Sequence, residues 1–480
     1  MKKRTFLSNI LTALLFLSLP LLTAPVKAQT DDKATEQTKR TEAEDGSDEF
    51  NPIERDDEYY ELLTLFADTL DQIDRNYVKD ISKRELMEAA IEGMIKKLDQ
   101  YSNYIPPKEI DRFKGSVKSE FGGIGIQVSI ENERLKVISP IVGSPAYRAG
   151  LIAGDVITKI EGDSTEGITL DQAVRKMKGK VGTKVTITIV HPDDPMPKQV
   201  TLERAIVRVQ TVLGNRRTDD DSWDYMYDDK RKIAYVRVTS FSERTVTELR
   251  DAMKDLLSRE MRGLVLDLRF NPGGLLSSAI EVCDMFIDRG RIVSTEGRNA
   301  PKRVWDATSK GTYPEFPIAV LVNRYSASAS EIVSACLQDH ERAVVVGERT
   351  WGKGSVQNII DLDNGRSALK LTTAGYMRPS GKNIHRFDGA TKEDEWGVKP
   401  NSEFTLRLTE REISDLVRFR RLRDIVQKRD PDQEEPKAEF EDRQLNLALE
   451  YVQSKIALGE AKAASAESSD KKTVDGKAGA

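Results

Sequence analysis

Serine and lysine side chains that can support acyl transfer occur close together in the second half of the chain. Ser326, Ser328 and Ser330 alternate with alanines, and Lys353 lies between two glycines further along. A serine hydroxyl attacks a carbonyl when a neighbouring base takes its proton, and a lysine can be that base if burial lowers its pKa and leaves the amine neutral. Spacing alone does not select one serine. The alternative interpretation is a solvated loop lysine and serines that cap a helix.

The elements that position these side chains are predicted to be a strand, a helix and a second strand. Residues 318–322 form a short apolar run, which suits a buried strand and is too short for a helix. Apolar residues at helical spacing begin after Ser328, and a second apolar run over 343–346 precedes Lys353. In an open sheet of this order both strands are parallel, so the loops that follow them meet at one edge. Ser328, at a helix N-terminus whose dipole favours negative charge, is thus expected to approach Lys353.

This stretch resembles the C-terminal processing, or tail-specific, proteases, which are Ser/Lys endopeptidases with a PDZ domain. The similarity rests on S-A-S-A-S-E-I around Ser328, on G-K-G-S-V-Q around Lys353, and on the offset of 25 positions between the two residues. The resemblance implies that Ser328 is the nucleophile, that Lys353 is its base and that Gln357 orients the lysine amine. It implies Asp339 as a supporting acid, although a charge near a helix end is the alternative. Peptide hydrolysis would proceed through an acyl-enzyme without a cofactor.

A glycine-rich loop follows another predicted buried strand at residues 263–268. Its sequence R-F-N-P-G-G, which begins at Arg269, resembles the R-x-N-P-G-G loop of the same family. Backbone amides in a glycine turn are rigid donors for a developing oxyanion. The amide of Gly273 or Gly274 is therefore expected to form an oxyanion hole with the amide of Ala329. A bare strand-to-helix turn is the alternative interpretation.

A second motif predicts peptide binding. The sequence F-G-G-I-G-I at residues 121–126, with S-P-A, A-G-L and G-D-V-I downstream, resembles a PDZ domain of the bacterial permuted kind. Gly123 and Gly125, on either side of Ile124, allow backbone amides to bind a peptide carboxylate, while the peptide adds as a strand beside Ile126. The resemblance implies protein substrates that are recognised through their C-termini. A purely structural PDZ domain is the alternative.

Other chemistries have little support in the sequence. Of the three histidines, His340 falls on the predicted helix of Ser328 but about 18 Å along it, too far for a catalytic triad, whereas His385 in a loop stays an alternative base. No His-x-x-x-His or paired-cysteine spacing predicts a metal site. Cys283 and Cys336 fall on apolar helical stripes and are predicted to be buried thiols. A disulfide between them is the alternative in an oxidising compartment.

The first residues predict export. Basic residues at positions 2–4 precede an apolar run over 10–22, and Val26-Lys27-Ala28 offers small residues to a signal peptidase. We expect cleavage near Ala28 and a periplasmic location, with an uncleaved membrane anchor as the alternative. A net charge of −5 without a basic cluster argues against nucleic-acid binding.

The whole chain is predicted to be a multidomain α/β protein. Its 480 residues suffice for several domains. The predicted order is signal peptide 1–28, flexible linker 29–52, N-terminal helical region 53–115, β-rich PDZ domain with two helices 116–206, α/β protease core 207–404, C-terminal helical region 405–460 and disordered tail 461–480. The acidic stretch 218–232 is expected to be an exposed excursion. The resemblance implies a homodimer through the N- and C-terminal helices, with simple packing on the core as the alternative. A catalytically silent peptide-binding scaffold and a small-ligand carrier are the alternative functions.

Overall fold

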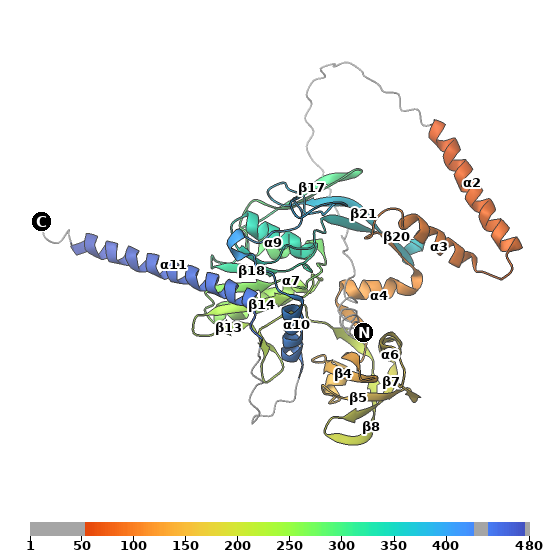
Figure 1. Ribbon diagram of the computed structural model, residues 1–480, viewed down its shortest axis with the longest axis horizontal. Coiled ribbons are helices and arrows are strands. Elements are labelled where there is room, and N and C mark those ends of the chain that lie inside the picture. The colour runs from red at the N-terminus through yellow and green to blue at the C-terminus, as the bar shows by residue number, and fades with distance from the viewer. Residues whose placement is uncertain (1–52, 427–439, 476–480) are drawn as a thin grey trace, which may run out of the picture. The chain divides into compact units, whose positions relative to one another are not determined.

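The computed structural model describes residues 53–426 and 440–475, and Figure 1 labels its elements. The predicted signal peptide and linker, residues 1–52, lie outside the described residues. The described residues form two compact units: one contains Lys108–Asn358 and the described residues from Thr372 onward, and the other contains residues 53–107 together with Ile359–Leu371. The mixture of helices and strands confirms the predicted α/β class.

A largely parallel sheet forms the centre of the first unit. Its parallel strands, in spatial order, are β14 (Ile233–Val238), β15 (Gly263–Asp267), β18 (Ile318–Val322) and β19 (Val344–Gly347). Two short strands, β10 (Val212–Leu213) and β13 (Met226–Asp228), pair antiparallel with β14. The strands predicted from apolar runs are confirmed, and so is their parallel direction. The loops after β15, β18 and β19 therefore lie at the same edge of the sheet.

Helices cover both faces of this sheet. They are α7 (Thr245–Ser258), α8 (Leu276–Asp284), α9 (Ala329–Asp339) and α11 (Arg443–Asp475), while α10 (Glu410–Asp424) packs near Phe270 of the loop after β15. Alternate residues of a strand point to opposite faces. Leu264 and Leu266 of β15 accordingly pack in a cluster with α7, α8 and α9, whereas Val265 between them packs with Ala448 and Val452 of α11. Helix α11 is therefore a layer of the core.

Antiparallel strands complete the core. β16 (Arg291–Gly297) pairs with β17 (Ala300–Asp306), and the end of β21 (Ser367–Met377) pairs with β16. β20 (Ser355–Leu362) begins two residues after Lys353 and pairs with β21. These two strands carry Gln357 and Tyr376 back toward the loops at the edge of the parallel sheet.

The predicted PDZ region has a sheet of its own in the first unit. Its elements are β3 (Ile126–Glu131), β4 (Arg134–Pro140), α5 (Pro145–Arg148), β5 (Val156–Ile160), β6 (Asp163–Ser164), α6 (Leu170–Met177), β7 (Lys184–His191) and β8 (Asp194–Glu203). β2 (Glu120–Gly123) pairs separately with β9 (Ala205–Arg208). β3 pairs with β4, and no other strand of the described residues pairs with its opposite edge. That edge, next to α6, is therefore available to an added strand.

The second unit begins with two helices. α2 (Ile53–Asn76) and α3 (Lys83–Ile95) confirm the helices expected in the N-terminal region, and β1 (Asn103–Ile105) pairs with β21. A further helix, α4 (Pro107–Val117), begins at a proline and belongs to the first unit from Lys108 on. Proline is tolerated at the first helical position because its missing N–H would have no partner there. No helix among the described residues is both long and apolar enough to cross a membrane.

The structure differs from two expectations. The tail from residue 461 is expected to be disordered, but α11 continues to Asp475. Alanine, lysine and glutamate favour a helix even without an apolar stripe. The acidic stretch is not simply exposed, because β12 (Trp223–Asp224) pairs with β11 (Arg216–Arg217), and the buried Trp223 ring lies 4.1 Å from the Arg217 guanidinium.

Candidate active site

Ser328 occupies a strained position at the start of α9. It is fully buried, and its backbone has φ 57° and ψ −115°, a conformation that residues with a side chain rarely adopt. Its hydroxyl has no hydrogen-bond partner within residues 53–426 and 440–475. Strain and an unpartnered buried hydroxyl each cost free energy, so their coincidence at one residue indicates a functional site.

The neighbouring serines have structural hydrogen bonds. The Ser326 hydroxyl donates to the Leu268 carbonyl at 2.8 Å, and the Ser330 hydroxyl donates to the Asn271 carbonyl at 3.0 Å. Both bonds fasten the loop after β18 to the loop after β15. The geometry therefore distinguishes Ser328 from the other two serines, which spacing alone does not.

Glu331 connects the loop of Ser328 with the loop of Lys353. Its Oε2 atom accepts hydrogen bonds from the backbone amides of Ser328, at 2.7 Å, and Lys353, at 2.8 Å. Its Oε1 atom accepts from the Thr350 hydroxyl at 2.5 Å and the Gly352 amide at 2.7 Å. Two amides that share one oxygen atom must lie close together, so the structure brings Ser328 and Lys353 to one place, as predicted from the parallel strands.

Glu331 is a site residue that the catalytic motifs do not single out, although the sequence carries a signal for it. A serine followed three positions later by glutamate is the pattern of a helix capping box, and S-A-S-E contains it. Burial raises the pKa of the Glu331 carboxyl, and the four donated hydrogen bonds oppose this effect by favouring the charged form. Every partner of this carboxyl is a donor, so the arrangement suits a carboxylate.

The lysine loop requires both of its glycines. A Cβ atom on Gly352 would lie 2.7 Å from the Cβ atom of Arg386, and one on Gly354 would collide with the backbone of His385. Lys353 between them is half-buried. The His385 ring packs edge-on against Phe387, with ring centres 4.9 Å apart. His385 thus lies beside the lysine loop, and it stays the alternative base.

Gln357 lies at the start of β20, fully buried. Its side-chain nitrogen donates to the hydroxyl groups of Ser355, at 2.8 Å, and Thr372, at 3.3 Å. Its Oε1 atom has no hydrogen-bond partner. These two bonds fix the orientation of the Gln357 amide and make its Oε1 atom available as an acceptor. An acceptor of this kind can orient a lysine amine, which donates hydrogen bonds.

The glycine loop after β15 packs directly on Ser328. A Cβ atom on Gly273 would lie 2.7 Å from the Cβ of Ser328 and 2.9 Å from the amide nitrogen of Ala329. The Gly273 amide donates to Oδ1 of the buried Asn271 at 2.8 Å, whereas the amides of Gly274 and Ala329 have no such acceptor among the described residues. Gly274 is therefore the better placed of the two candidate glycine donors.

Buried ion pairs hold the first residue of this loop. Arg269 is paired with Asp267 at 2.7 Å and with Asp442 of the C-terminal segment at 2.8 Å, and its side chain has no exposed surface. Arg420 of α10 also pairs with Asp267. Although burial raises the pKa values of Asp267 and Asp442, Arg269 outweighs it and holds both below the usual range. The loop is thus supported by helices that are distant in sequence.

Asp339 is not brought to the site. It lies at the other end of α9, about 16 Å from Ser328 at roughly 1.5 Å per residue. Its carboxylate pairs with Arg378 at 2.6 Å, and Arg378 holds the pKa of Asp339 low although burial raises it. His340 is next to it and bonds the Arg291 carbonyl at 2.7 Å. These residues fasten α9 to neighbouring segments.

Cys283 and Cys336 are buried free thiols, as predicted. His191 pairs with Asp155 at 2.6 Å inside the PDZ region. No cluster of possible metal ligands occurs in residues 53–426 and 440–475.

The predicted peptide site lies at the open edge of β3. Ile124 is a core residue of the PDZ region, while Ile126 is half-buried at the start of the strand. A Cβ atom on Gly123 would contact the Phe121 ring at 3.2 Å, and one on Gly125, whose φ is 78°, would collide with Ser144. The glycines therefore shape this loop, and the open edge beside them suits an added peptide strand.

Comparison with known proteins agrees with this architecture. Residues 232–403 match Peptidase family S41, residues 136–190 match the PDZ domain, and residues 21–108 match the N-terminal domain of the activating protease CtpB. The chain is 43% identical over 331 residues to a carboxy-terminal-processing protease of Bartonella bacilliformis, which covers 68% of this chain and 73% of that protein.

Two further proteins are similar. The carboxy-terminal processing protease CtpA of Bacillus subtilis is 35% identical over 66% of this chain and 65% of its own length. The solved structure of a photosystem II D1 C-terminal processing protease is 27% identical, covers 72% of this chain and 92% of that chain, and has a TM-score of 0.40. The chain belongs to the carboxy-terminal processing proteases, with an S41 peptidase core and a PDZ domain.

Proposed function

We propose that this protease is a serine endopeptidase in which Ser328 is the nucleophile and Lys353 is the general base. One observation carries the proposal: Oε2 of Glu331 binds the backbone amides of both residues, beside a buried Ser328 hydroxyl that has no partner. Such an arrangement holds nucleophile and base in fixed relation before substrate arrives, which is a large part of catalysis.

In the proposed reaction, Oγ of Ser328 attacks the scissile carbonyl while its proton passes to the neutral amine of Lys353. The carbonyl electrons move to the oxygen, and the amides of Gly274 and Ala329 stabilise the resulting oxyanion. The lysine ammonium then protonates the leaving amine as the C–N bond breaks and an acyl-enzyme forms. Water attacks the acyl-enzyme and gives its proton to Lys353, which passes it to Oγ as the bond to Ser328 breaks and the acid product leaves. Gln357 supports the amine through its unpartnered Oε1 atom.

The first experiment measures cleavage of an unstructured protein by the mature chain beside three alanine variants. Ser328→Ala and Lys353→Ala are each expected to lower kcat by about 10³-fold or more, because nucleophile and base act as a unit. His385→Ala is expected to stay active. The pH profile of kcat/KM should rise as Lys353 loses its proton.

Three outcomes would contradict parts of this proposal. Activity that survives in Lys353→Ala and is lost in His385→Ala would make the histidine the base. Activity that survives in Ser328→Ala would show that Ser328 is not the nucleophile. A wild-type protein that binds C-terminal peptides and cuts nothing would support the silent scaffold instead.

We also propose that the PDZ domain recognises substrate C-termini. The open edge of β3, with half-buried Ile126 and Val128 facing α6, supports this proposal. Substituting Gly125 would also distort the loop, because its Cβ would meet Ser144, so a change in the substrate is the cleaner test. A peptide with a free carboxylate should be cleaved faster than its amidated twin. Equal rates would argue for a purely structural PDZ domain.

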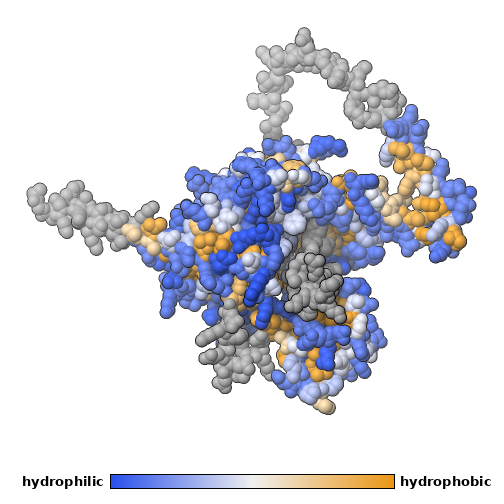
Figure 2. All heavy atoms as spheres, viewed as in Figure 1, coloured by the Kyte–Doolittle hydropathy of each residue, from blue (hydrophilic) through white to orange (hydrophobic). Residues whose placement is uncertain are grey.

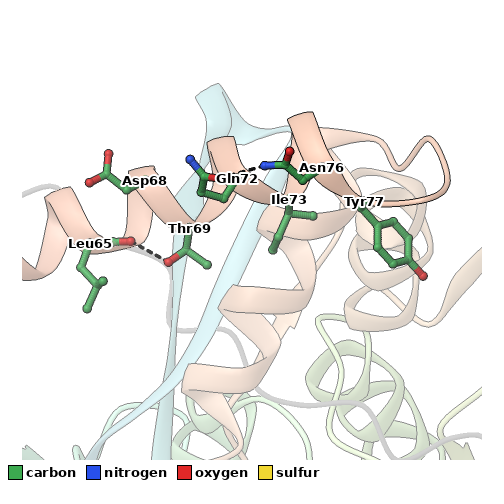
Figure 3. Close-up of a pocket in the computed structure, with 7 residues that line it drawn as sticks. All are labelled: Leu65, Asp68, Thr69, Gln72, Ile73, Asn76 and Tyr77. Carbon is green, nitrogen blue, oxygen red and sulfur yellow. Dashed lines mark hydrogen bonds between the residues drawn. The ribbon is translucent and has the colours of Figure 1, made fainter.

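A homodimer through the N-terminal helix is a further part of the proposal. α2 exposes a row of large apolar side chains: Tyr59, Tyr60, Leu62, Leu63, Leu65 and Phe66. Figure 2 shows apolar surface gathered over this helix. A groove on α2 is lined by seven residues of the same helical segment, from Leu65 to Tyr77, as Figure 3 shows. The apolar face of α2 thus provides one side of the proposed dimer contact, and the same face on a second copy provides the other side.

We further propose export to the periplasm, which the basic, apolar and small-residue pattern of residues 1–28 supports. The mature protein should begin near Gln29. N-terminal sequencing of protein from a periplasmic fraction tests this, and an intact N-terminus in the membrane fraction would favour the uncleaved anchor.

A further inference from the structure

Tyr376 is a second buried hydroxyl without a partner beside the nucleophile. Its side chain has no exposed surface, and its phenol oxygen has no hydrogen-bond partner. Its backbone amide donates to the Gly354 carbonyl at 2.7 Å, which fastens this part of β21 to the lysine loop. The phenol therefore belongs to the lining of the site that contains Ser328 and Lys353.

Backbone contacts bring Tyr376 toward Ser328, because the Tyr376 amide bonds the residue after Lys353 and Glu331 binds the amides of both Lys353 and Ser328. Burial raises the pKa of the Tyr376 phenol, and an interaction with the Ser328 side chain lowers it in part. Neither hydroxyl meets the geometry of a hydrogen bond in the resting structure. The two groups are therefore neighbours whose bond is not yet formed. A phenol that keeps its proton can only donate toward a developing negative charge.

We propose that Tyr376 is a catalytic residue that donates a hydrogen bond to Oγ of Ser328 as the nucleophile is deprotonated. This proposal rests on the proposed Ser328–Lys353 chemistry. The proton of Ser328 still passes to Lys353, and Tyr376 keeps its own proton throughout. The hydrogen bond would stabilise charge on Oγ while it attacks, and again when Oγ leaves the acyl-enzyme. A bond that strengthens only in the transition state raises kcat without changing KM.

The unpartnered state of both hydroxyls distinguishes this role from a structural one. A structural phenol stabilises the fold through a bond already present, so losing it lowers the melting temperature. Tyr376 has no such bond to lose. Removing its hydroxyl should therefore stabilise the folded protein, because a buried polar group without a partner is lost, and should slow the reaction. Such a trade-off between stability and activity is expected of an active-site group.

The test compares Tyr376→Phe with Tyr225→Phe in the full chain. Tyr225 is a matched control: its burial likewise raises the pKa of its phenol, but its hydroxyl donates to the Val212 carbonyl at 3.5 Å. Tyr376→Phe should lower kcat by about 10- to 100-fold with KM within about twofold and the melting temperature unchanged or higher. Tyr225→Phe should leave kcat unchanged and lower the melting temperature slightly.

A kcat for Tyr376→Phe within twofold of wild type would overturn the inference, while a loss of activity in Ser328→Ala in the same experiment would leave the proposed function standing. A fall in melting temperature with unchanged kcat would assign the phenol a structural role. If Tyr376→Phe folds poorly, 3-fluorotyrosine at this position replaces it. This residue keeps the hydroxyl and strengthens it as a donor, so kcat should not fall. A lower kcat there would count against the inference.

Discussion

Ser328 adopts a backbone conformation that favours glycine, and the surrounding loops hold it there. Its amide is held by Glu331, and its Cβ packs against the position of Gly273. Such strain persists only where neighbouring structure imposes it. The energetic signature of this site is therefore a set of unfavourable features, namely a positive φ and buried polar atoms without partners, rather than a set of strong contacts.

Ser328→Gly should accordingly be more stable than Ser328→Ala, although both are inactive. Glycine removes the strain at φ 57°, whereas alanine keeps it. We expect a difference of about 1 kcal/mol in the free energy of unfolding, measured by chemical denaturation. Equal stability of the two variants would show that the conformation is not strained.

Glu331→Gln should lower catalytic activity more than the same substitution at Glu412. The glutamine amide has one acceptor where the carboxylate has two, and its NH₂ group would face donors such as the Lys353 amide. We expect kcat to fall about 100-fold and stability to fall by about 1–3 kcal/mol. Glu412→Gln is the matched control, because Glu412 occupies the same capping position at the start of α10. Similar losses of activity in both variants would contradict the prediction that Glu331 is needed to hold the loops of Ser328 and Lys353 together.

At the scale of elements, the loops after three parallel strands converge, and the C-terminal helices support one of them. α11 covers one face of the sheet, and Asp442, just before it, forms an ion pair with Arg269 at the start of the glycine loop. The S41 match ends at residue 403, so these helices lie beyond it. Truncating them would expose a face of the core and leave a buried arginine with fewer partners.

Asp442→Asn should destabilise the protein by about 3 kcal/mol at neutral pH, because it leaves part of a buried arginine charge unpaired. Since the folded pKa of Asp442 is depressed, its contribution is present above the unfolded value and lost as pH falls. The wild type should therefore lose stability more steeply than the variant below about pH 4, measured by thermal unfolding across pH.

Glu460→Gln is the control for this experiment. Glu460 lies on the same helix and pairs with Arg262 at the surface, so its loss should change stability by less than about 1 kcal/mol. An Asp442→Asn variant as stable as this control, at every pH, would contradict the prediction.

At the scale of the whole molecule, the proposed homodimer depends on the apolar face of α2. Leu65 is 63% exposed on this face. Leu65→Glu should convert dimers to monomers in sedimentation velocity, because it places a charge in the proposed contact. Met196→Glu, which changes an exposed side chain of the PDZ sheet, should leave the dimer intact. A wild-type protein that is monomeric at all concentrations would contradict the proposal.

The sequence by itself determined the strand and helix order around Ser328, because apolar runs and periodicity are local properties of the chain. It also determined the family, since S-A-S-A-S-E-I and G-K-G-S-V-Q are contiguous motifs. Residues 461–475 show the limit of this approach, because a helix without an apolar stripe leaves no periodic signal.

Only the tertiary structure decided which serine and tyrosine hydroxyls form hydrogen bonds. Ser326 and Ser330 bond carbonyls of a loop that is far away in sequence, and the Tyr376 amide bonds the Gly354 carbonyl of the lysine loop. It also places Asp339 away from the site, because Asp339 is the last residue of α9, eleven positions after Ser328. These relations depend on how loops from different strands pack together, and that packing is a property of the folded chain rather than of any one segment.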